Sequence, residues 1–353
     1  MIFLGDTAVP FDMEPRIDKI PEVFANNAVI ANLEGTICSR EQASLSENRL
    51  FNTDAVFAFM RSCGVDAVTL ANNHIMDVPE AFSGTLEALR QNGLGYVGAG
   101  ENAAEAAREL VMDDNGVRTV VAAFGWNVIS CVYAGKNTPG VNPMEYDNVI
   151  RTVRRLREKY QEDRLVTILH WNYELEKYPL PAQRRLAREL IDMGVYAVVG
   201  HHPHCVQGIE TYKGKTIAYS VGNFFIPQGV YMNGRLKFPE YASEEMALEI
   251  SDGGVNVHRF GYDAQEQTLS FCGSEQVCDS ARIKELTPFD GMSDKEYVKW
   301  FRKNRAKKKL LPVYTDYSKR FGNGIKDTFV LSRQRMINAL FASGVKNRSG
   351  VKN

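Results

Sequence analysis

The chain has 353 residues, of which 44% are hydrophobic and 24% are charged, and its formal net charge is -1. This length and composition are typical of a globular protein with a large core, built as one big domain or two. The near-zero charge argues against nucleic acid as a partner, because binding phosphates needs a clear excess of Lys and Arg.

The beginning of the chain has neither a basic and apolar leader nor an apolar run long enough to span a bilayer. The six cysteines are scattered without the spacing of a zinc finger or a CxxC motif, which is typical of reduced thiols. We therefore expect a cytoplasmic protein.

Short apolar strands alternate with helical patterns along the chain, which predicts βαβ units. The predicted strands are Ile2 to Leu4, Val29 to Ile30, Val68 to Leu70, Leu165 to Leu169, Ala197 to Val199 and Ile217 to Tyr219. The predicted helices are Asp54 to Cys63, Pro79 to Gln91, Tyr146 to Tyr160 and Pro181 to Met193. We expect the helices to cover the sheet faces.

Turn signals between β-rich runs predict antiparallel hairpins and, with them, a second sheet. These signals are Asp114-Asn115-Gly116, Lys213-Gly214-Lys215 and Asp252-Gly253-Gly254. One hairpin would join Met246 to Ile250 with Val255 to Phe260, and Leu269 to Cys272 would be the next strand.

The composition turns basic after about residue 284, so we predict a main domain at 1–284 and a mainly helical extension at 285–353. Its basic cluster consists of Lys299, Arg302, Lys303, Arg305, Lys307, Lys308 and Lys309. A solvated helix face explains such a cluster, and a docking patch for an anionic membrane surface or polymer is the alternative. Farther on, one side of a helix should pack on the body through Phe329, Val330, Met336, Ile337, Leu340 and Phe341.

Three of the six histidines, His201, His202 and His204, directly follow one of the apolar strands. Imidazoles cost free energy to bury without partners, so three of them at the carboxyl end of a strand indicate a divalent cation. A polar loop that happens to contain histidine is the alternative.

Oxygen and nitrogen donors follow several predicted strands: Asp6, Glu34, Asn73, His74, His170, His202 and His204. Each has a structural alternative, because Asp6 can cap a turn, Asn73 can hold a left-handed loop and His170 can lie in the core. Together, at the carboxyl ends of strands, they favour a site for one or two ions of Mn, Zn or Fe.

Motifs containing these residues occur in a characteristic order over roughly residues 1 to 275. They are Gly5-Asp6, Asn32-Leu33-Glu34-Gly35, Ala71-Asn72-Asn73-His74 with Asp77, His170-Trp171-x-x-Glu174, Gly200-His201-His202-Pro203-His204 and Tyr219-Ser220-x-Gly222-Asn223-Phe224. In these motifs the chain resembles the CapA family of bacterial capsule and poly-gamma-glutamate biosynthesis proteins. The resemblance implies a calcineurin-like metallophosphoesterase fold, an α/β/β/α sandwich of four layers with two mixed β-sheets.

The resemblance also implies roles for single residues. One metal ion would be held by Asp6, Glu34 and His204, and a second by Glu34, Asn73, His170 and His202, with His201 as the alternative to His202. His74 would be the general acid that protonates a leaving oxygen, oriented by Asp77. Beside the ligands, the predicted substrate-binding residues are His201, Trp171, Glu174 and Asn223.

Two positions depart from the ordinary metallophosphoesterase pattern. The first motif, Asp-x-His in that superfamily, is Asp6-Thr7-Ala8 here, so one ligand of the first metal is missing. The bridging Asp is replaced by Glu34. Both changes are typical of the CapA family. With them, the site would hold either one or two metal ions.

Two functions are compatible with these features. The first is a metal-dependent hydrolase that cleaves a phosphoester, amide or ester bond in an anionic capsule-type polymer or its precursor. The second is a non-catalytic assembly or binding factor for such a polymer, in which the metal site binds a carboxylate or phosphate group.

Overall fold

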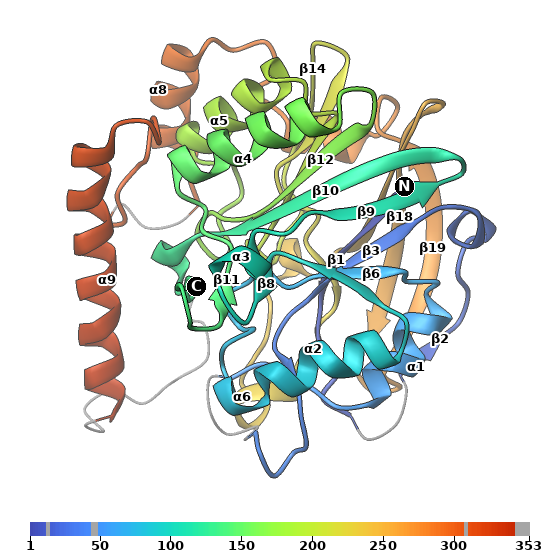
Figure 1. Cartoon of the computed structure of the whole chain (residues 1–353). Coiled ribbons are helices and arrows are strands. Elements are labelled where there is room, and N and C mark those ends of the chain that lie inside the picture. Colours follow the sequence, from blue (N-terminus) through green and yellow to red (C-terminus); the bar gives the residue numbers. More distant parts are fainter. Residues whose placement is uncertain (12–14, 44–48, 307–309, 343–353) are drawn as a thin grey trace.

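Two mixed β-sheets pack face to face in the computed structural model, which describes residues 1–11, 15–43, 49–306 and 310–342 (Figure 1). Helices cover the outer face of each sheet, with α4 (Tyr146–Lys159) and α5 (Pro181–Asp192) on one side and α1 (Ala55–Ser62) and α2 (Phe82–Gln91) on the other. The predicted four-layer α/β/β/α sandwich is confirmed.

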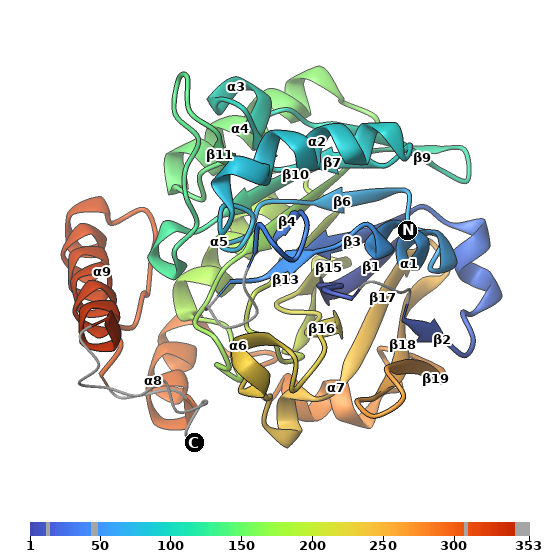
Figure 2. The same ribbon diagram turned by 90° about the horizontal axis from the view of Figure 1, so that it is seen from below.

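The first sheet has nine strands within the described residues. Their order is β2 (Arg16–Ile17), β19 (Thr268–Gln276), β18 (Gly254–Asp263), β17 (Glu245–Ser251), β16 (Asn223–Phe225), β1 (Ile2–Thr7), β3 (Val29–Leu33), β6 (Ala67–Thr69) and β7 (Gly95–Val97). Strands β16, β1, β3, β6 and β7 run parallel, whereas β17, β18 and β19 form an antiparallel meander (Figure 2).

The second sheet has four parallel strands in its centre and an antiparallel strand at each edge. Its order is β14 (Ile209–Tyr212), β15 (Lys215–Ala218), β13 (Ala197–His201), β12 (Arg164–His170), β10 (Val117–Gly125) and β9 (Leu110–Asp114). Two short strand pairs complete the described sheets: β8 (Ala99–Gly100) with β11 (Gly140–Val141), and β4 (Thr36–Ile37) with β5 (Phe51–Asn52).

All three predicted hairpins are present, but one of them joins the other sheet. The turns at 114–116 and 213–215 connect β9 to β10 and β14 to β15 at the edges of the second sheet. The hairpin of β17 and β18 instead extends the first sheet, because β17 pairs with both β1 and β16. Alternation of side chains predicts a strand but not its neighbour, so the expectation that this hairpin would help to build a second sheet was wrong.

Three hydrophobic clusters correspond to the three spaces between the layers. Val56 and Leu86 pack the first-sheet helices onto its outer face, and Val153 and Leu190 do the same on the second sheet. A third cluster, to which Phe3, Ile30, Val121, Ile168 and Val199 belong, fills the space between the two sheets. The remaining short helices are η1 (Glu22–Asn26), η2 (Pro79–Ala81), α3 (Ala103–Ala106), η3 (Asn127–Ile129), α6 (Tyr231–Gly234), η4 (Glu240–Ala242) and α7 (Ala281–Leu286).

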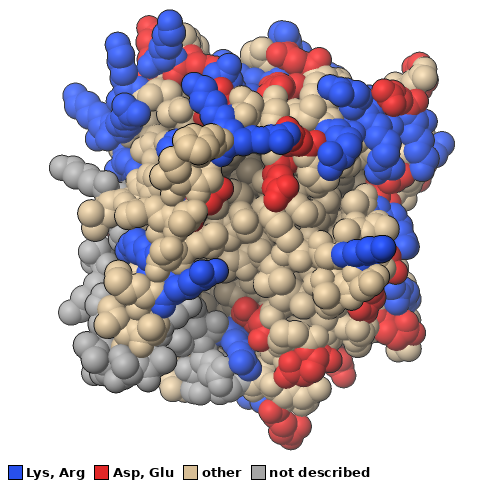
Figure 3. Space-filling model, turned by 60° about the vertical axis from the view of Figure 1, so that its left-hand side comes forward, with Lys and Arg blue, Asp and Glu red and all other residues tan. Residues whose placement is uncertain are grey.

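The segment after residue 285 contains α8 (Asp294–Asn304) and α9 (Arg320–Ala342), on the face shown in Figure 3. Its Phe289, Tyr297 and Phe301 belong to the cluster on the outer face of the second sheet. The domain boundary at residue 284 stays a prediction. Three lysines of the predicted basic cluster, at 307–309, lie outside the described residues, and so does the side chain of the residue at 341.

The predicted packing of the last helix is only partly correct. Val330 is buried in the core, but Phe329 and Met336 are 52% and 59% exposed. The helical pattern shows which residues share a face but not which neighbour covers it. No helix in the described residues combines the length and the apolar composition that crossing a bilayer requires.

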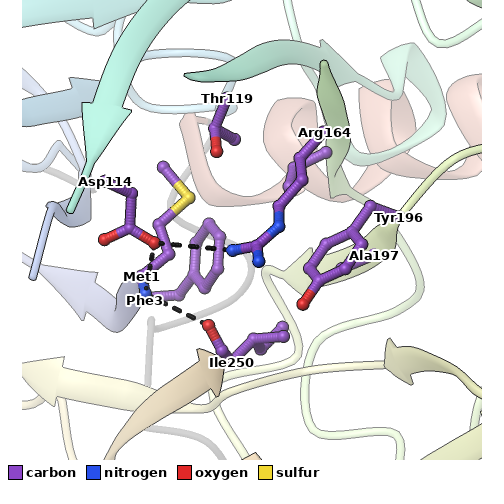
Figure 4. Close-up of a pocket in the computed structure, with 9 residues that line it drawn as sticks. Met1, Phe3, Asp114, Thr119, Arg164, Tyr196, Ala197 and Ile250 are labelled. Atoms are coloured by element: carbon purple, nitrogen blue, oxygen red, sulfur yellow. Dashed lines mark hydrogen bonds and ion pairs between the residues drawn. The ribbon is translucent and has the colours of Figure 1, made fainter. Parts of the chain in front are cut away.

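The two sheets close tightly at the edge where β12 and β13 begin (Figure 4). The cavity there measures only about 10 Å³ and is lined by Met1, Phe3, Asp114, Arg164 and their neighbours. The amino group of Met1 lies 2.9 Å from Asp114 and donates to the carbonyl of Ile250. This edge therefore has no room for a ligand larger than water.

A buried ion pair ties the segment after 285 to the second sheet. Arg184 on α5 is fully buried and lies 3.1 Å from a carboxylate oxygen of Glu210 on β14. Its guanidinium also donates to the carbonyl oxygens of Met292 and Phe289. Removing Arg184 would leave the buried carboxylate of Glu210 with Arg188 and the hydroxyl of Tyr219 as its remaining partners, and the carbonyl oxygens of Met292 and Phe289 would lose a charged donor.

We therefore expect Arg184→Ala to lower the free energy of unfolding by about 3–5 kcal/mol, the range for a broken buried pair. The control is Arg185→Ala, because Arg185 is 53% exposed and pairs with Asp316 at the surface. That change should cost about 1 kcal/mol or less. Urea denaturation of both variants measures the difference, and equal midpoints would contradict this role of Arg184.

Candidate metal centre

The candidate site lies at the carboxyl ends of the parallel strands, opposite the closed edge. In the first sheet Asp6 on β1 is in register with Asn32 on β3 and with Asn223 on β16. In the second sheet His170 on β12 is in register with His201 on β13. Because the two sheets face each other, these strand ends bring donors from both into one buried place.

Close backbone approach at two glycines allows this convergence. A Cβ atom on Gly5, which precedes Asp6, would lie 2.5 Å from the backbone of Gly222 and Asn223. A Cβ atom on Gly200, which precedes the histidine cluster, would lie 2.0 Å from the carbonyl oxygen of Tyr219. Any larger residue at either position would push apart the strands that carry the site.

The carboxylate of Asp6 is fully buried and has four polar partners. Asn32 donates to Oδ1 at 2.7 Å, and Nδ1 of His201 lies 3.0 Å from the same oxygen. Nδ1 of His204 lies 3.1 Å from Oδ2, to which the backbone N–H of His202 also donates. Burial alone would raise the pKa of Asp6, but the bonds with His201 and His204 hold it well below its usual range.

Glu34 is also fully buried but has fewer partners. Its Oε1 lies 3.4 Å from the Asn32 amide and 3.6 Å from Nε2 of His170. Its Oε2 lies 4.0 Å from Nε2 of His204 and has no hydrogen-bond donor among the described residues. Burial and the charge of Asp6 raise the pKa of Glu34 to about 7. A buried carboxylate oxygen without a donor is suited to a cation.

One atom each from Asp6, Glu34 and His204 lies within 4.8 Å of the others, as ligands of one ion must. Burial would lower the pKa of His204, but the carboxylates of Glu34 and Asp6 raise it to about 10. The donor set of two carboxylates and an imidazole suits Mn, Zn or Fe. The residues named for the first metal therefore come together, although they are far apart in the sequence.

The residues predicted for the second metal also converge, around His170. Nε2 of His170 lies 2.8 Å from Oδ1 of Asn73, and the rings of His170 and His202 are 5.0 Å apart. Nδ1 of each of these two histidines has no hydrogen-bond partner among the described residues. Burial, followed by the neighbouring imidazoles, lowers the pKa of both, so they are neutral and keep lone pairs for a cation.

The loop after β13 holds two of these histidines in an unusual backbone conformation. His202 and His204 have φ angles of 95° and 56°, in the region that residues other than glycine rarely adopt. Such conformations cost on the order of 1–3 kcal/mol each and persist where the surrounding structure enforces them. They are concentrated at functional sites.

His74 and Asp77 form a pair at the more accessible side of the cluster. Nδ1 of His74 lies 2.6 Å from Oδ2 of Asp77, which also accepts the backbone N–H of Leu50. The two side chains are 16% and 19% exposed, so solvent can reach them. Burial would lower the pKa of His74, but the charge and hydrogen bond of Asp77 raise it.

The predicted substrate-binding residues are placed differently from one another. His201 and Asn223 lie inside the cluster, bonded to Asp6 and His204 respectively. Glu174 is exposed. Its charge helps to raise the pKa of His204, but this effect is smaller than that of burial, which lowers the pKa, and than those of Glu34 and Asp6, which raise it. Trp171 lies away from solvent: it is fully buried in the core on the second sheet and donates to the carbonyl of Tyr219.

Three residues of the site were not singled out from the sequence. The amide of Asn32 donates to the carboxylates of both Asp6 and Glu34. Its position two residues before Glu34, in the motif Asn32-Leu33-Glu34-Gly35, is a sequence signal for this role. Phe238 packs its ring 5.3 Å from that of His204. Glu245, in register with Asn223, is buried, and burial and the charge of Asp6 raise its pKa to about 8. No sequence motif marks either Phe238 or Glu245.

Comparison with known proteins gives a match over most of the chain. The sequence profile described as "Bacterial capsule synthesis protein PGA_cap" matches residues 8–228. "Capsule biosynthesis protein CapA" of Bacillus anthracis is 34% identical over 173 residues, which are 48% of this chain and 42% of that protein. "PGA biosynthesis protein CapA" of Bacillus subtilis (strain 168) is 31% identical over 216 residues, 59% of this chain and 56% of that protein. The chain thus spans about half the length of these curated relatives.

Solved structures resemble the chain more distantly. The 5'-nucleotidase precursor from Thermus thermophilus has a TM-score of 0.40 at 16% identity and covers 78% of this chain and 52% of its own. The calcineurin-like phosphoesterase YfkN from Bacillus subtilis has a TM-score of 0.38 at 12% identity and covers 85% of this chain and 98% of its own. Likenesses at this level say nothing about activity.

The family profile covers more than half of the chain and includes every predicted site residue except Asp6. The resemblance to CapA proteins is therefore confirmed. The chain belongs to the PGA_cap family of bacterial capsule synthesis proteins.

Proposed function

We propose that this chain is a metal-dependent hydrolase of the phosphoesterase type, which acts on an anionic capsule polymer or on its precursor. The observation that supports this most is the meeting of Asp6, Glu34 and His204, whose ligand atoms lie within 4.8 Å of one another in the interior. The family to which the chain belongs supports the polymer as the substrate class.

Two ligand sets that share Glu34 account for the arrangement. Asp6, Glu34 and His204 would hold one ion. Glu34 would also serve the second set, which consists of Asn73, His170 and His202. Among the described residues, Oε2 of Glu34 and Nδ1 of both histidines have no hydrogen-bond partner, and this supports the assignment, because buried polar atoms in native proteins almost always have partners.

The bound cations would supply positive charge that lowers the pKa of a water molecule and offsets charge on the scissile group. The chain's own part is proton transfer. Asp77 fixes Nδ1 of His74 at 2.6 Å, which leaves Nε2 of the imidazole for the substrate. His74 would donate its proton to the leaving oxygen, as a general acid does.

A second function, binding or assembly without catalysis, is supported by the contacts of Asp6. This carboxylate already has Asn32, His201 and His204 as partners, so charge compensation does not require a metal there. Ala8 occupies the position where the phosphoesterase motif has a histidine ligand. In this alternative the cluster would bind a carboxylate or phosphate group of the polymer.

Metal content separates the ligand sets. After incubation with Mn²⁺ and desalting, we expect the wild-type chain to retain two ions, measured by mass spectrometry of the metal. Asp6→Ala and His202→Ala should each lose one ion, and Glu34→Ala should lose both because it belongs to both sets. Loss of a ligand leaves the remaining donors too few to hold the ion.

The matched control is His258→Ala. His258 is the one histidine outside the cluster, buried on β18 between Glu249 and Ser274. This variant should retain both ions. A wild-type chain with no metal, or a His258→Ala chain that loses as much metal as His202→Ala, would contradict the assigned ligands.

Leaving-group dependence tests the role of His74. We expect His74→Ala to lower kcat for diphenyl phosphate by about 10²–10⁴, the usual contribution of a general acid. The loss should be smaller for bis-p-nitrophenyl phosphate, because p-nitrophenolate leaves without a proton. The metal content of the variant should stay that of the wild type.

Asp77→Asn keeps the hydrogen bond but removes the charge, so its losses should lie between those of the wild type and His74→Ala. Equal losses of His74→Ala on the two esters would show that His74 is not the general acid. A metal-loaded wild type that cleaves neither ester would favour the binding function.

A further inference from the structure

The outward face of α9 carries a stripe of large apolar side chains. Phe321, Ile325, Phe329 and Met336 are 86%, 60%, 52% and 59% exposed. Their spacings of four, four and seven residues place them on one side of the helix, since a helix turns by about 100° per residue. Isolated exposed apolar residues are ordinary, but four on one side of one helix mark an interaction surface.

The opposite side of the helix holds it on the body, so the stripe is presented by a docked element. Val330 and Asn323 are buried there, and Asn323 donates to the carbonyl of Asp316 at 2.8 Å. Tyr314 donates to Asp327 at 2.6 Å, and Lys326 donates to the carbonyl of Val313. The apolar face therefore points away from the core, against the usual arrangement of a surface helix.

Charge identifies the kind of partner. Residues 294–342 contain thirteen Lys and Arg and four Asp and Glu, although the whole chain has a formal net charge of -1. On the helix, Arg333 and Arg335 lie to either side of the stripe by their position in the sequence. In Figure 3 the Lys and Arg side chains gather mainly along the upper part of this face, with Asp and Glu side chains among them, and the centre is less charged.

We propose that α9 docks the chain on an anionic lipid bilayer. An apolar stripe between basic residues fits the boundary between lipid headgroups and acyl chains, into which an interfacial helix sinks its apolar face. Long cationic side chains then reach the anionic headgroups, with about 1 kcal/mol for each Lys or Arg near the surface.

This partner accounts for both the apolar stripe and the basic residues better than the two alternatives do. A second copy of the chain would bring two strongly basic segments together, and like charges repel. A soluble anionic polymer would satisfy the basic residues but would leave the four apolar side chains in water. The proposal is independent of the hydrolase function, because no site residue belongs to α9.

The test is co-sedimentation with phosphatidylcholine vesicles, with and without phosphatidylglycerol. The wild-type chain should bind the anionic vesicles and not the neutral ones. Ile325→Ser with Phe329→Ser should weaken binding at least about tenfold, since burial of each such side chain contributes more than one factor of ten. Both positions are exposed, so the thermal melting curve should not change.

The matched control replaces two exposed valines elsewhere, Val111→Ser with Val132→Ser, which are 41% and 48% exposed. This control should bind vesicles like the wild type. Equal binding by the α9 variant and the wild type would overturn the proposal, as would no binding to anionic vesicles. Binding to soluble polyglutamate that equals vesicle binding would assign the surface to a polymer instead. A dimer that the α9 changes dissociate, without vesicle binding, would assign it to a second copy.

Discussion

The carboxylates of Asp6 and Glu34 lie in the interior, where an ionised oxygen costs several kcal/mol unless donors or cations surround it. Asp6 is compensated within the chain by Asn32, His201 and His204. Glu34 is not, and its Oε2 has no donor among the described residues. This difference explains why the pKa of Asp6 falls well below its usual range, whereas burial raises that of Glu34 to about 7. The fold therefore holds a buried carboxylate, that of Glu34, which a bound cation would stabilise.

The two sheets create this place by their geometry. The parallel strands of both sheets end at the same edge, and side chains at those ends face one another across the sandwich. Gly5 and Gly200 let the strands approach closely enough for the donors to meet. At the opposite edge the sheets close on a cavity of about 10 Å³, which has no room for a ligand larger than water. The arrangement of the strands thus determines both the fold and the position of the candidate metal ligands.

The sequence was sufficient for most of the long strands and helices and for the expectation that the ligand residues meet, because local periodicity and position after a strand indicate them, but it did not predict the short strands β7 and β16. It was not sufficient where contacts with residues far away in the sequence determine strand pairing or burial. β17 pairs with β1 and β16 through contacts far apart in the chain, Trp171 turned out to lie in the core, and Phe329 on α9 faces outward. Asn32 could have been predicted because it belongs to a motif. Glu245 could not, because only its register with Asn223 places it at the site.

Anomalous diffraction from crystals grown with Mn²⁺ tests the central claim, that the strand ends form a metal centre, most directly. We expect one anomalous peak among Asp6, Glu34 and His204 and a second among Glu34, Asn73, His170 and His202. The absence of anomalous density in the cluster, with His201 and His204 still bonded to Asp6, would contradict the claim. The cluster would then be a self-sufficient network of buried charges.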